Sequence, residues 1–397
     1  MWFFLVRSFL AGTAIPLFFF FIFLFSRGAA AQSPVQQPVR IGLTLGLSGK
    51  YAQLAGYQEK GYRLWQQDVN RRGGIFGRPV ELMLLDDKSD PATAARLYQH
   101  LIAEERVDLV FSPFSSDISE AVLPVTAKNG YPLILAGASS DHLFQQGYDH
   151  VFGLFVPSSK FALGFLEMLV QHRIDGIAVF SDDSLFSRSL VEGIRKWSVR
   201  LGLKVVVDEK IVKGSGHFDA LARRARDAGA KVVVLASYLE DAVALRRAFT
   251  AIKWLPRAYY VPVGPGTGEY QKALGQDSDL VFSTSQWEFH GKQSRNQPDV
   301  FVKAFEATYG QRPSYFAATA YAAGQLLENA VRQTGSLERS RISHALAILD
   351  AVTVIGRYGV DRTGTQVKQF YLIVQVQEGK FEVVWPPESL TAAPRFL

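Results

Sequence analysis

Cysteine is absent from this sequence of 397 residues, and its absence excludes several kinds of site. Without thiols the chain has no disulfide, no thiolate metal site, no Cys nucleophile and no lipid-anchored cysteine. Histidine is also sparse, because the seven residues are scattered and no two stand at the spacing of a helical zinc site. We therefore expect neither a metal nor a cofactor.

Local catalytic and nucleotide-binding motifs are missing as well. The sequence has no G-x-S-x-G turn and no S-x-x-K, and the glycines between Gly42 and Gly49 fit neither the dinucleotide nor the P-loop spacing. A catalytic triad assembled from distant positions leaves no local motif. The absence of local motifs therefore does not by itself exclude an enzyme. A secreted hydrolase stays an alternative, in addition to the two binding functions given below.

Charge of one sign is not concentrated anywhere in the chain. The 43 Lys and Arg residues exceed the 37 Asp and Glu residues by six, and the basic residues are spread along the sequence rather than clustered with aromatic ones. A nucleic-acid-binding face would require such a cluster. We therefore expect no nucleic-acid partner.

A long apolar run occurs at the N-terminus. Residues 8–25 follow Arg7, contain no charge and lead to an Ala-x-Ala sequence that ends at Ala31. These three parts predict a signal peptide over residues 1–31, cleaved after Ala31, and export to the periplasm. The alternative is an uncleaved anchor, because 18 helical residues span roughly 27 Å. Cleavage removes Arg7 and Arg27 and lowers the net charge from +6 to +4.

The rest of the chain alternates short apolar runs with helical periodicity. At 48% hydrophobic content it has enough apolar residues for two or three domains. The strand-helix order begins at residue 39 and a second series begins near residue 161, which predicts two lobes, each a doubly wound parallel sheet covered by helices. Three helices within residues 298–350 have no strand between them, and residues 370–384 read as a hairpin.

Residues 107–141 repeat one arrangement twice, a buried strand followed by a hydroxyl-rich turn. Ser115 and Ser116 precede a predicted helix over residues 118–128, with Ser116 or Asp117 as its N-cap, and a second turn carries Ser139. Neighbouring parallel strands end at one crevice, so we expect both turns to face one ligand. Hydroxyls and free N–H groups suit a small anion, carboxylate or phosphate, although such serines also serve as simple caps.

Three segments together resemble a known family: LSGKYAQLAG at residues 47–56, NRRGGIFGRPVELMLLDDKSDP at 70–91 and FSSDISEAVLPV at 114–125. They resemble periplasmic solute-binding proteins of the branched-chain amino-acid type, similar to leucine-binding protein. The resemblance implies two lobes joined by three hinge crossings, near residues 155–158, 286–288 and 352–356. It further implies a monomer that closes on a small-molecule solute and delivers it to the membrane permease of an ABC importer. A ligand sensor of the same fold that signals to a protein partner is the alternative.

The resemblance also implies the division of the chain. We expect a linker at 32–38 after the signal peptide, an N-terminal lobe from 39–155 and 289–353, a C-terminal lobe from 156–288 and 354–388, and a tail at 389–397.

By the same resemblance, four positions hold the carboxylate of the ligand and two aromatic side chains match ligand contacts. A third aromatic, Trp287, is a further candidate to face a ring of the solute, and packing in the core is an equal alternative for all three aromatics. The carboxylate positions are Ser115, Ser116, Ala138 and Ser139, and the aromatic ones are Phe186, Tyr238 and Trp287.

Gly266 stands where amino-acid binders of this family carry the acid that pairs with the ligand ammonium. An unpaired buried ammonium costs several kcal/mol, so this glycine argues against an ordinary α-amino acid. Glu269 or Asp241 would substitute if the local alignment shifts. A carboxylate without an amine, aromatic or aliphatic, is at least as well supported.

Overall fold

The computed structural model describes residues 37–212, 218–289 and 298–397. The predicted signal peptide and nearly all of the predicted linker lie outside these residues. No helix within the described ranges combines the length and the apolar character that crossing a membrane requires.

The first sheet is built on β1 (Val39–Leu45), whose residues are almost all buried. It is flanked by two parallel strands, β2 (Val80–Asp86) and β3 (Leu109–Val110). Beside them β4 (Leu133–Leu135) and β5 (Val151–Gly153) form a second parallel pair. The serine turns of residues 112–116 and 137–140 follow β3 and β4, so they stand where the sequence predicted them, at strand carboxyl ends.

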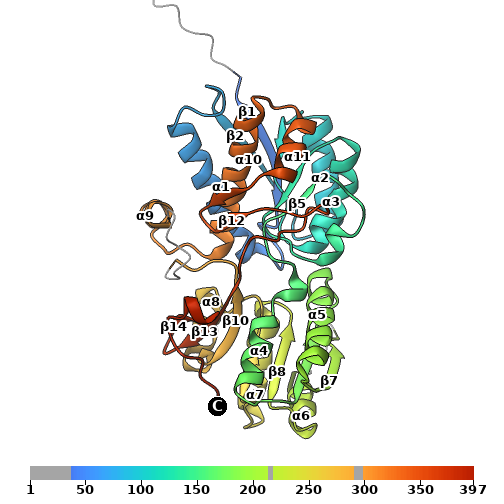
Figure 1. Ribbon diagram of the computed structural model, residues 1–397, viewed down its shortest axis with the longest axis vertical. Coiled ribbons are helices and arrows are strands. Elements are labelled where there is room, and N and C mark those ends of the chain that lie inside the picture. The colour runs from blue at the N-terminus through green and yellow to red at the C-terminus, as the bar shows by residue number, and fades with distance from the viewer. Residues whose placement is uncertain (1–36, 213–217, 290–297) are drawn as a thin grey trace, which may run out of the picture. The chain divides into compact units, whose positions relative to one another are not determined.

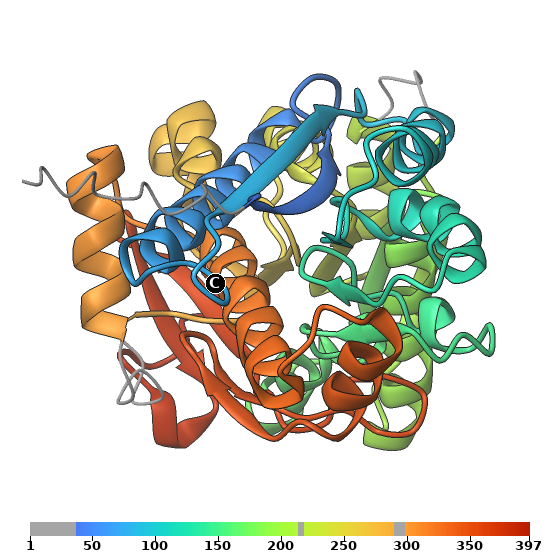
Figure 2. The same cartoon turned by 90° about the horizontal axis from the view of Figure 1, so that it is seen from above.

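Helices from both ends of the chain cover this sheet (Figures 1 and 2). Gly61 of α1 approaches α10 so closely that an added Cβ would lie 2.1 Å from the carbonyl oxygen of Ala317. Helix α10 therefore packs against α1 of the first lobe, and the assignment of the whole segment 289–353 to that lobe stays a prediction. The helices are α1 (Ala52–Arg71), α2 (Pro91–Ala103), α3 (Ser116–Lys128), α9 (Pro298–Tyr309), α10 (Tyr315–Thr334) and α11 (Arg339–Ile348).

The second sheet has seven strands in the order β14-β13-β10-β9-β8-β6-β7. Five neighbouring strands, β7, β6, β8, β9 and β10, run parallel. The predicted C-terminal hairpin adds β13 and β14, which run antiparallel. The strands are β6 (Ile177–Ser181), β7 (Val205–Lys210), β8 (Val232–Ala236), β9 (Ala258–Tyr260), β10 (Val281–Ser285), β13 (Leu372–Gln377) and β14 (Lys380–Trp385). The helices are α4 (Leu163–Gln171), α5 (Leu185–Leu201), α6 (Phe218–Asp227), α7 (Leu239–Ala251) and α8 (Gly268–Leu274).

The three segments expected to be crossings are hydrogen-bonded to one another through two glutamines. The Gln286 side-chain oxygen accepts from the Val156 N–H at 3.2 Å. The Gln369 amide donates to the carbonyl oxygens of Gln286 at 3.0 Å and Ile355 at 2.7 Å. The segments around residues 156, 286 and 355 therefore lie side by side, as three connecting segments of one hinge must.

A short hairpin in the expected third crossing was not predicted. It pairs β11 (Ala351–Thr353) with β12 (Gly356–Tyr358). Beyond it, the Gly364 carbonyl still accepts from the N–H of Gly153 in β5 at 2.8 Å, so the chain remains beside the first lobe past residue 353. The expected domain boundaries stay a prediction.

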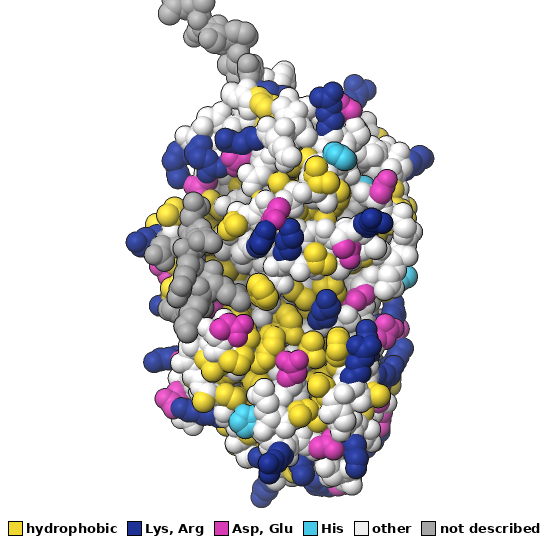
Figure 3. Space-filling model, viewed as in Figure 1, with side chains coloured by type: hydrophobic (Ala, Val, Ile, Leu, Met, Phe, Trp, Pro, Cys, Tyr) yellow, Lys and Arg dark blue, Asp and Glu magenta, His cyan; other side chains and the backbone are white. Residues whose placement is uncertain are grey.

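One face of the surface carries charges of both signs. Figure 3 shows basic and acidic side chains interspersed over the face it presents, with hydrophobic side chains gathered between them.

Candidate functional site

The first serine turn begins helix α3 at Ser116, two residues before the predicted start at residue 118. Ser115 is the N-cap, since its hydroxyl accepts from the Ile118 N–H at 3.3 Å, so the prediction of Ser116 or Asp117 is wrong. Ser115 adopts a φ of 85°, a conformation that few residues other than glycine adopt. Ser116 thereby becomes the first residue of α3, facing the second turn.

The two serine turns are joined by hydrogen bonds. The Ser116 hydroxyl accepts from the N–H groups of Ser139 at 3.3 Å and Ser140 at 3.1 Å, and the Ser115 N–H donates to the carbonyl of Gly137 at 3.2 Å. The turns following β3 and β4 therefore meet at one place, and that they face one ligand stays a prediction. Because the Ser116 oxygen already accepts twice, its own proton remains to be donated.

Five of the eight predicted residues line one small cavity, which we call the serine chamber. Ser115, Ser116 and Ser139 come from the first lobe, and Phe186 and Tyr238 come from the second. The free volume is about 20 Å³, room for a water but not for a solute. The other lining residues are Phe114, Gly137, Phe155, Phe161, Val263, Tyr315 and Phe316.

The remaining three predicted residues do not line the serine chamber. Ala138 is buried in the second turn, between two residues that do line the chamber. Trp287 is buried too, with its ring 5.8 Å from that of Phe301, so its surroundings are those of a core residue. Gly266 borders a different cavity.

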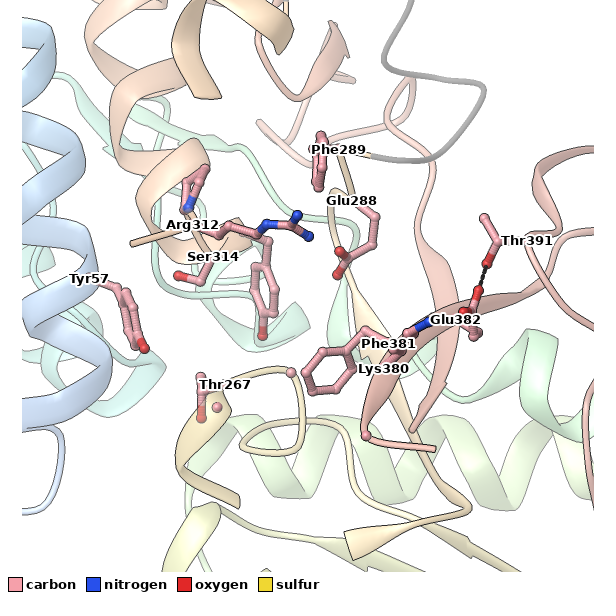
Figure 4. Close-up of a pocket in the computed structure, with 15 residues that line it drawn as sticks. Tyr57, Thr267, Glu288, Phe289, Arg312, Ser314, Lys380, Phe381, Glu382 and Thr391 are labelled. Atoms are coloured by element: carbon pink, nitrogen blue, oxygen red, sulfur yellow. Dashed lines mark hydrogen bonds between the residues drawn. The ribbon is translucent and has the colours of Figure 1, made fainter. Parts of the chain in front are cut away.

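The Gly266 cavity has a volume of about 670 Å³ and adjoins the serine chamber, because Tyr315 lines both. Figure 4 shows the carboxyl group of Glu288 and the guanidinium of Arg312 extending into the same space. Burial raises the pKa of Glu288 to about 7. Glu269, one of the two substitute acids named above, accepts from the Tyr57 hydroxyl at 3.2 Å.

A third cavity, also of about 670 Å³, adjoins the serine chamber on the side of Tyr238, which lines both. We call it the acidic cavity, because Asp182, Asp183, Glu240 and Asp241 line it together with Lys50 and Tyr51. Burial and the nearby Tyr51, Asp182 and Asp117 hold the pKa of Tyr238 well above its usual range. Sequence reasoning named only Asp241 and Tyr238 of this group; Lys50 and Tyr51 belong to the quoted segment 47–56 but were not named as site residues.

Direct contacts between residues of the two lobes surround the chamber. The Asp117 carboxylate at the start of α3 accepts from the N–H of Leu185, the first residue of α5, at 3.1 Å. The hydroxyls of Ser140 and Ser189 are 2.7 Å apart, and the Ser189 oxygen also accepts from the Asp141 N–H at 3.2 Å. These contacts, with the small chamber volume, define a closed arrangement of the lobes.

A comparison with protein families decides what kind of protein carries this site. The profile described as "Periplasmic binding protein" matches residues 38–380. The chain belongs to the periplasmic binding protein family. The family resemblance seen in the sequence is confirmed. The family members reported below are binding proteins, in agreement with the expectation from the resemblance that this chain is no enzyme.

Curated relatives of this periplasmic binding protein share about a quarter of its residues. Leu/Ile/Val-binding protein homolog 7 of Brucella abortus is 24% identical over 379 residues, covering 90% of this chain and 94% of the relative. A leucine-, isoleucine-, valine-, threonine- and alanine-binding protein of Pseudomonas aeruginosa is 24% identical over 341 residues, covering 85% of this chain and 89% of the relative.

Solved structures confirm the fold. The branched-chain amino acid transporter substrate binding protein of Streptococcus pneumoniae, in complex with isoleucine, matches with a TM-score of 0.80, 24% identity, and coverage of 88% of this chain and 100% of that one. A solute binding protein of R. palustris in complex with benzoate matches with a TM-score of 0.77, 21% identity, and coverage of 91% and 97%. The two-lobed α/β fold expected from the sequence is thus confirmed.

Proposed function

We propose that this protein is the periplasmic substrate-binding component of an ABC importer, and that its two lobes close on a small solute through a carboxylate. The observation that carries the proposal is the serine chamber, where donors from one lobe face aromatic rings from the other. The family supports the periplasm as the place of action and a membrane permease as the partner. N-terminal sequencing of exported protein tests cleavage after Ala31.

The hydroxyl donors of the serine chamber suit a carboxylate, because no Asp or Glu side chain among the described residues accepts hydrogen bonds from them. The Ser139 hydroxyl makes no hydrogen bond to any described residue, and the Ser116 hydroxyl retains its proton for donation. No carboxylate side chain is among the residues that line the chamber. Hydrogen bonds to a charged group contribute about 1.5–3 kcal/mol each, so two or three donors would hold a buried carboxylate.

The opposite wall suits an apolar portion of the solute. Phe161 and Phe186 lie edge to face at 5.6 Å between ring centres, and Phe186 lies 5.9 Å from Tyr238. Since the chamber holds only a water as it stands, a solute would enter when the lobes part and would take the place of side-chain contacts. Hinge closure of this kind is a common mechanism in two-lobed binding proteins.

An amino acid and a carboxylate without an amine are both consistent with these walls, and the two structural relatives named above were solved with one of each, isoleucine and benzoate. Position 266 carries no acid, which favours a solute with no α-ammonium, whereas the Glu288 carboxyl group in the same cavity is an acid that an ammonium would pair with. Native mass spectrometry of protein purified from its own cells, followed by identification of the released solute, tests the proposal. We expect a small acid, and a released solute without any acidic group would contradict the proposal.

A ligand sensor of the same fold remains the alternative function. It would keep the N-terminal apolar run as an anchor and would signal to a protein partner. Transport assays in cells lacking the protein separate the two, because only the importer component is required for solute uptake.

A further inference from the structure

We propose that the solute carries an aromatic ring beside its carboxylate, so that the substrate class is an aryl carboxylate, with the ring attached directly or through one or two carbons. This inference rests on the proposed function, since it needs the carboxylate to be held by the serines. It deepens that function, because an aliphatic acid would satisfy the serine donors equally well.

A chain of eight aromatic rings runs along the wall of the serine chamber, and we call it the aromatic belt. Each ring centre lies between 4.0 and 6.0 Å from the next one. All of these rings except that of Tyr51 line the chamber itself. In order along the belt, the residues are Phe161, Phe186, Tyr238, Tyr51, Phe114, Phe316, Tyr315 and Phe155.

Neighbouring rings of the belt mostly meet edge to face. Five of the seven consecutive pairs have this geometry, for example Phe114 and Phe316 with an angle of 74° between their planes. The positive edge of one ring is then directed at the negative face of the next. A planar solute ring has the same charge distribution and would extend this pattern, whereas an alkyl group would gain only from leaving water.

The rest of the chamber wall offers little to a branched or charged solute. Apart from the belt and the two serine turns, the only described residue that lines the chamber is Val263. Leu, Ile and Met, whose flexible side chains adapt to alkyl groups of different shape, are not among these described lining residues. No charged side chain is among them either, so the part of the solute beyond the carboxylate is uncharged.

The belt passes from one lobe to the other at a ring contact. Tyr51 stands directly before α1, which covers the first sheet, and Tyr238 directly before α7, which belongs to the second. Their ring centres are 5.2 Å apart and their planes are inclined by 61°. Parting of the lobes to admit a solute breaks this contact. An aromatic ring of the solute would replace it with contacts of the same kind, and an aliphatic group would not.

Calorimetry with matched pairs of probes tests the inference. The pairs are benzoate with cyclohexanecarboxylate, phenylacetate with cyclohexylacetate, and 3-phenylpropanoate with 3-cyclohexylpropanoate. The cyclohexyl compound has the larger apolar surface, so a wall that acts only by excluding water would favour it. For at least one pair we expect the opposite, with the aryl compound binding about tenfold or more tightly, because it gains edge-to-face contacts.

A variant of the belt locates the source of this ratio. Phe186→Leu removes one ring of the belt but keeps an apolar side chain, and the ratio should fall to about threefold or less. Phe249→Leu is the matched control, because Phe249 is also buried but packs between Trp254 and Tyr259 and does not line the chamber. The control should keep the ratio of the wild type.

The outcomes separate the inference from the proposed function. If the cyclohexyl member of every pair binds as tightly as the aryl member or more tightly, the aromatic class is wrong and the carboxylate site stands. If no member of any pair binds, both are wrong. Phe161→Leu is the second variant if Phe186→Leu fails to fold, and a ratio that is unchanged in the variant that folds would contradict the role of the belt.

Discussion

At the scale of single residues, the two central serines have different roles. Ser116 accepts two backbone N–H groups, so its replacement by alanine would leave two buried donors without partners and would change stability as well as binding. The Ser139 hydroxyl bonds to no described protein atom. Replacing the Ser139 side chain should therefore change ligand affinity without changing stability.

We expect Ser139→Ala to weaken binding of the native solute by about 1–3 kcal/mol, because it removes one donor to a buried carboxylate. Isothermal titration calorimetry measures the effect. Ser198→Ala is the matched control, since Ser198 is also buried, lies on α5 away from the chamber, and has no partner among the described residues for its hydroxyl. Equal affinities for the two variants would remove Ser139 from the site.

Asp87 predicts a pH dependence of stability. Burial raises its pKa to about 6 from an ordinary value of 3.8, although the Thr44 hydroxyl donates to it at 2.7 Å. Between these values the folded state holds the proton that the unfolded state has lost, so the free energy of unfolding falls as the pH rises through this window.

The variant Asp87→Asn removes this titration. Relative to the variant, the wild type should lose up to about 3 kcal/mol of its free energy of unfolding between pH 3.5 and pH 7. Urea unfolding at several pH values measures the difference. A difference between the two proteins that stays constant with pH would show that Asp87 has the same pKa in the folded and unfolded states.

The sequence was informative about residues that belong to local motifs. Ser115, Ser116 and Ser139 were named because each follows a strand, and Phe186 and Tyr238 because the resemblance extends through them. Lys50, Tyr51 and Asp182 were not named as site residues, because they come together only when the lobes close. Trp287 was a candidate to face the solute with core packing as an equal alternative, and its ring lies beside that of Phe301.

At the scale of elements, the contact of α1 with α10 depends on glycine. An added Cβ at Gly61 would lie 2.1 Å from a carbonyl oxygen of α10, whereas one at Gly56, on the same helix, would meet nothing within 4 Å. Both glycines are within a helix, so the intrinsic helix propensity of the two positions is the same and only the packing differs.

We expect Gly61→Ala to destabilise the protein by about 1–3 kcal/mol, since the two helices must move apart. Gly56→Ala should instead stabilise it by about 0.5–1 kcal/mol, because alanine loses less conformational entropy in a helix. Urea unfolding of both variants measures this contrast. Destabilisation of similar size in both would contradict the close approach.

Long periodic elements were predicted well and short ones poorly. The three helices predicted within residues 298–350 agree with α9, α10 and α11. The predicted helix at 118–128 ends at Lys128, as α3 does. The strands β5, β11 and β12 have three residues each, too few for a pattern.

At the scale of the whole molecule, contacts between the lobes set the balance between open and closed states. The hydrogen bond between the Ser140 and Ser189 hydroxyls at 2.7 Å exists only when the lobes are together. Affinity for a solute bound between lobes depends on the population of the closed state.

We therefore expect Ser189→Ala to lower solute affinity by about 1 kcal/mol, roughly fivefold, mainly through faster dissociation. Stopped-flow fluorescence measures the dissociation rate, and small-angle X-ray scattering of the unliganded protein measures a shift towards larger dimensions. Ser198→Ala on the same helix is the control. A dissociation rate unchanged in Ser189→Ala would mean that this contact does not contribute to closure.

The two-lobed arrangement could be predicted from the order of strands and helices and from the three motifs. The hydrogen bonds of Gln286 and Gln369 that join the crossings could not, because each glutamine contacts residues far away in the sequence. The volumes of the cavities could not be predicted from the sequence either, since they depend on how far the lobes have closed.

The central claim is that serine donors of the first lobe hold a carboxylate of the solute while the second lobe closes over the rest. A crystal structure of the protein with the solute it carries from the cell tests this most directly. We predict a carboxylate oxygen within hydrogen-bonding distance of the Ser139 hydroxyl and of the Ala138 N–H. A solute bound between the lobes with no acidic oxygen near either group would contradict the account.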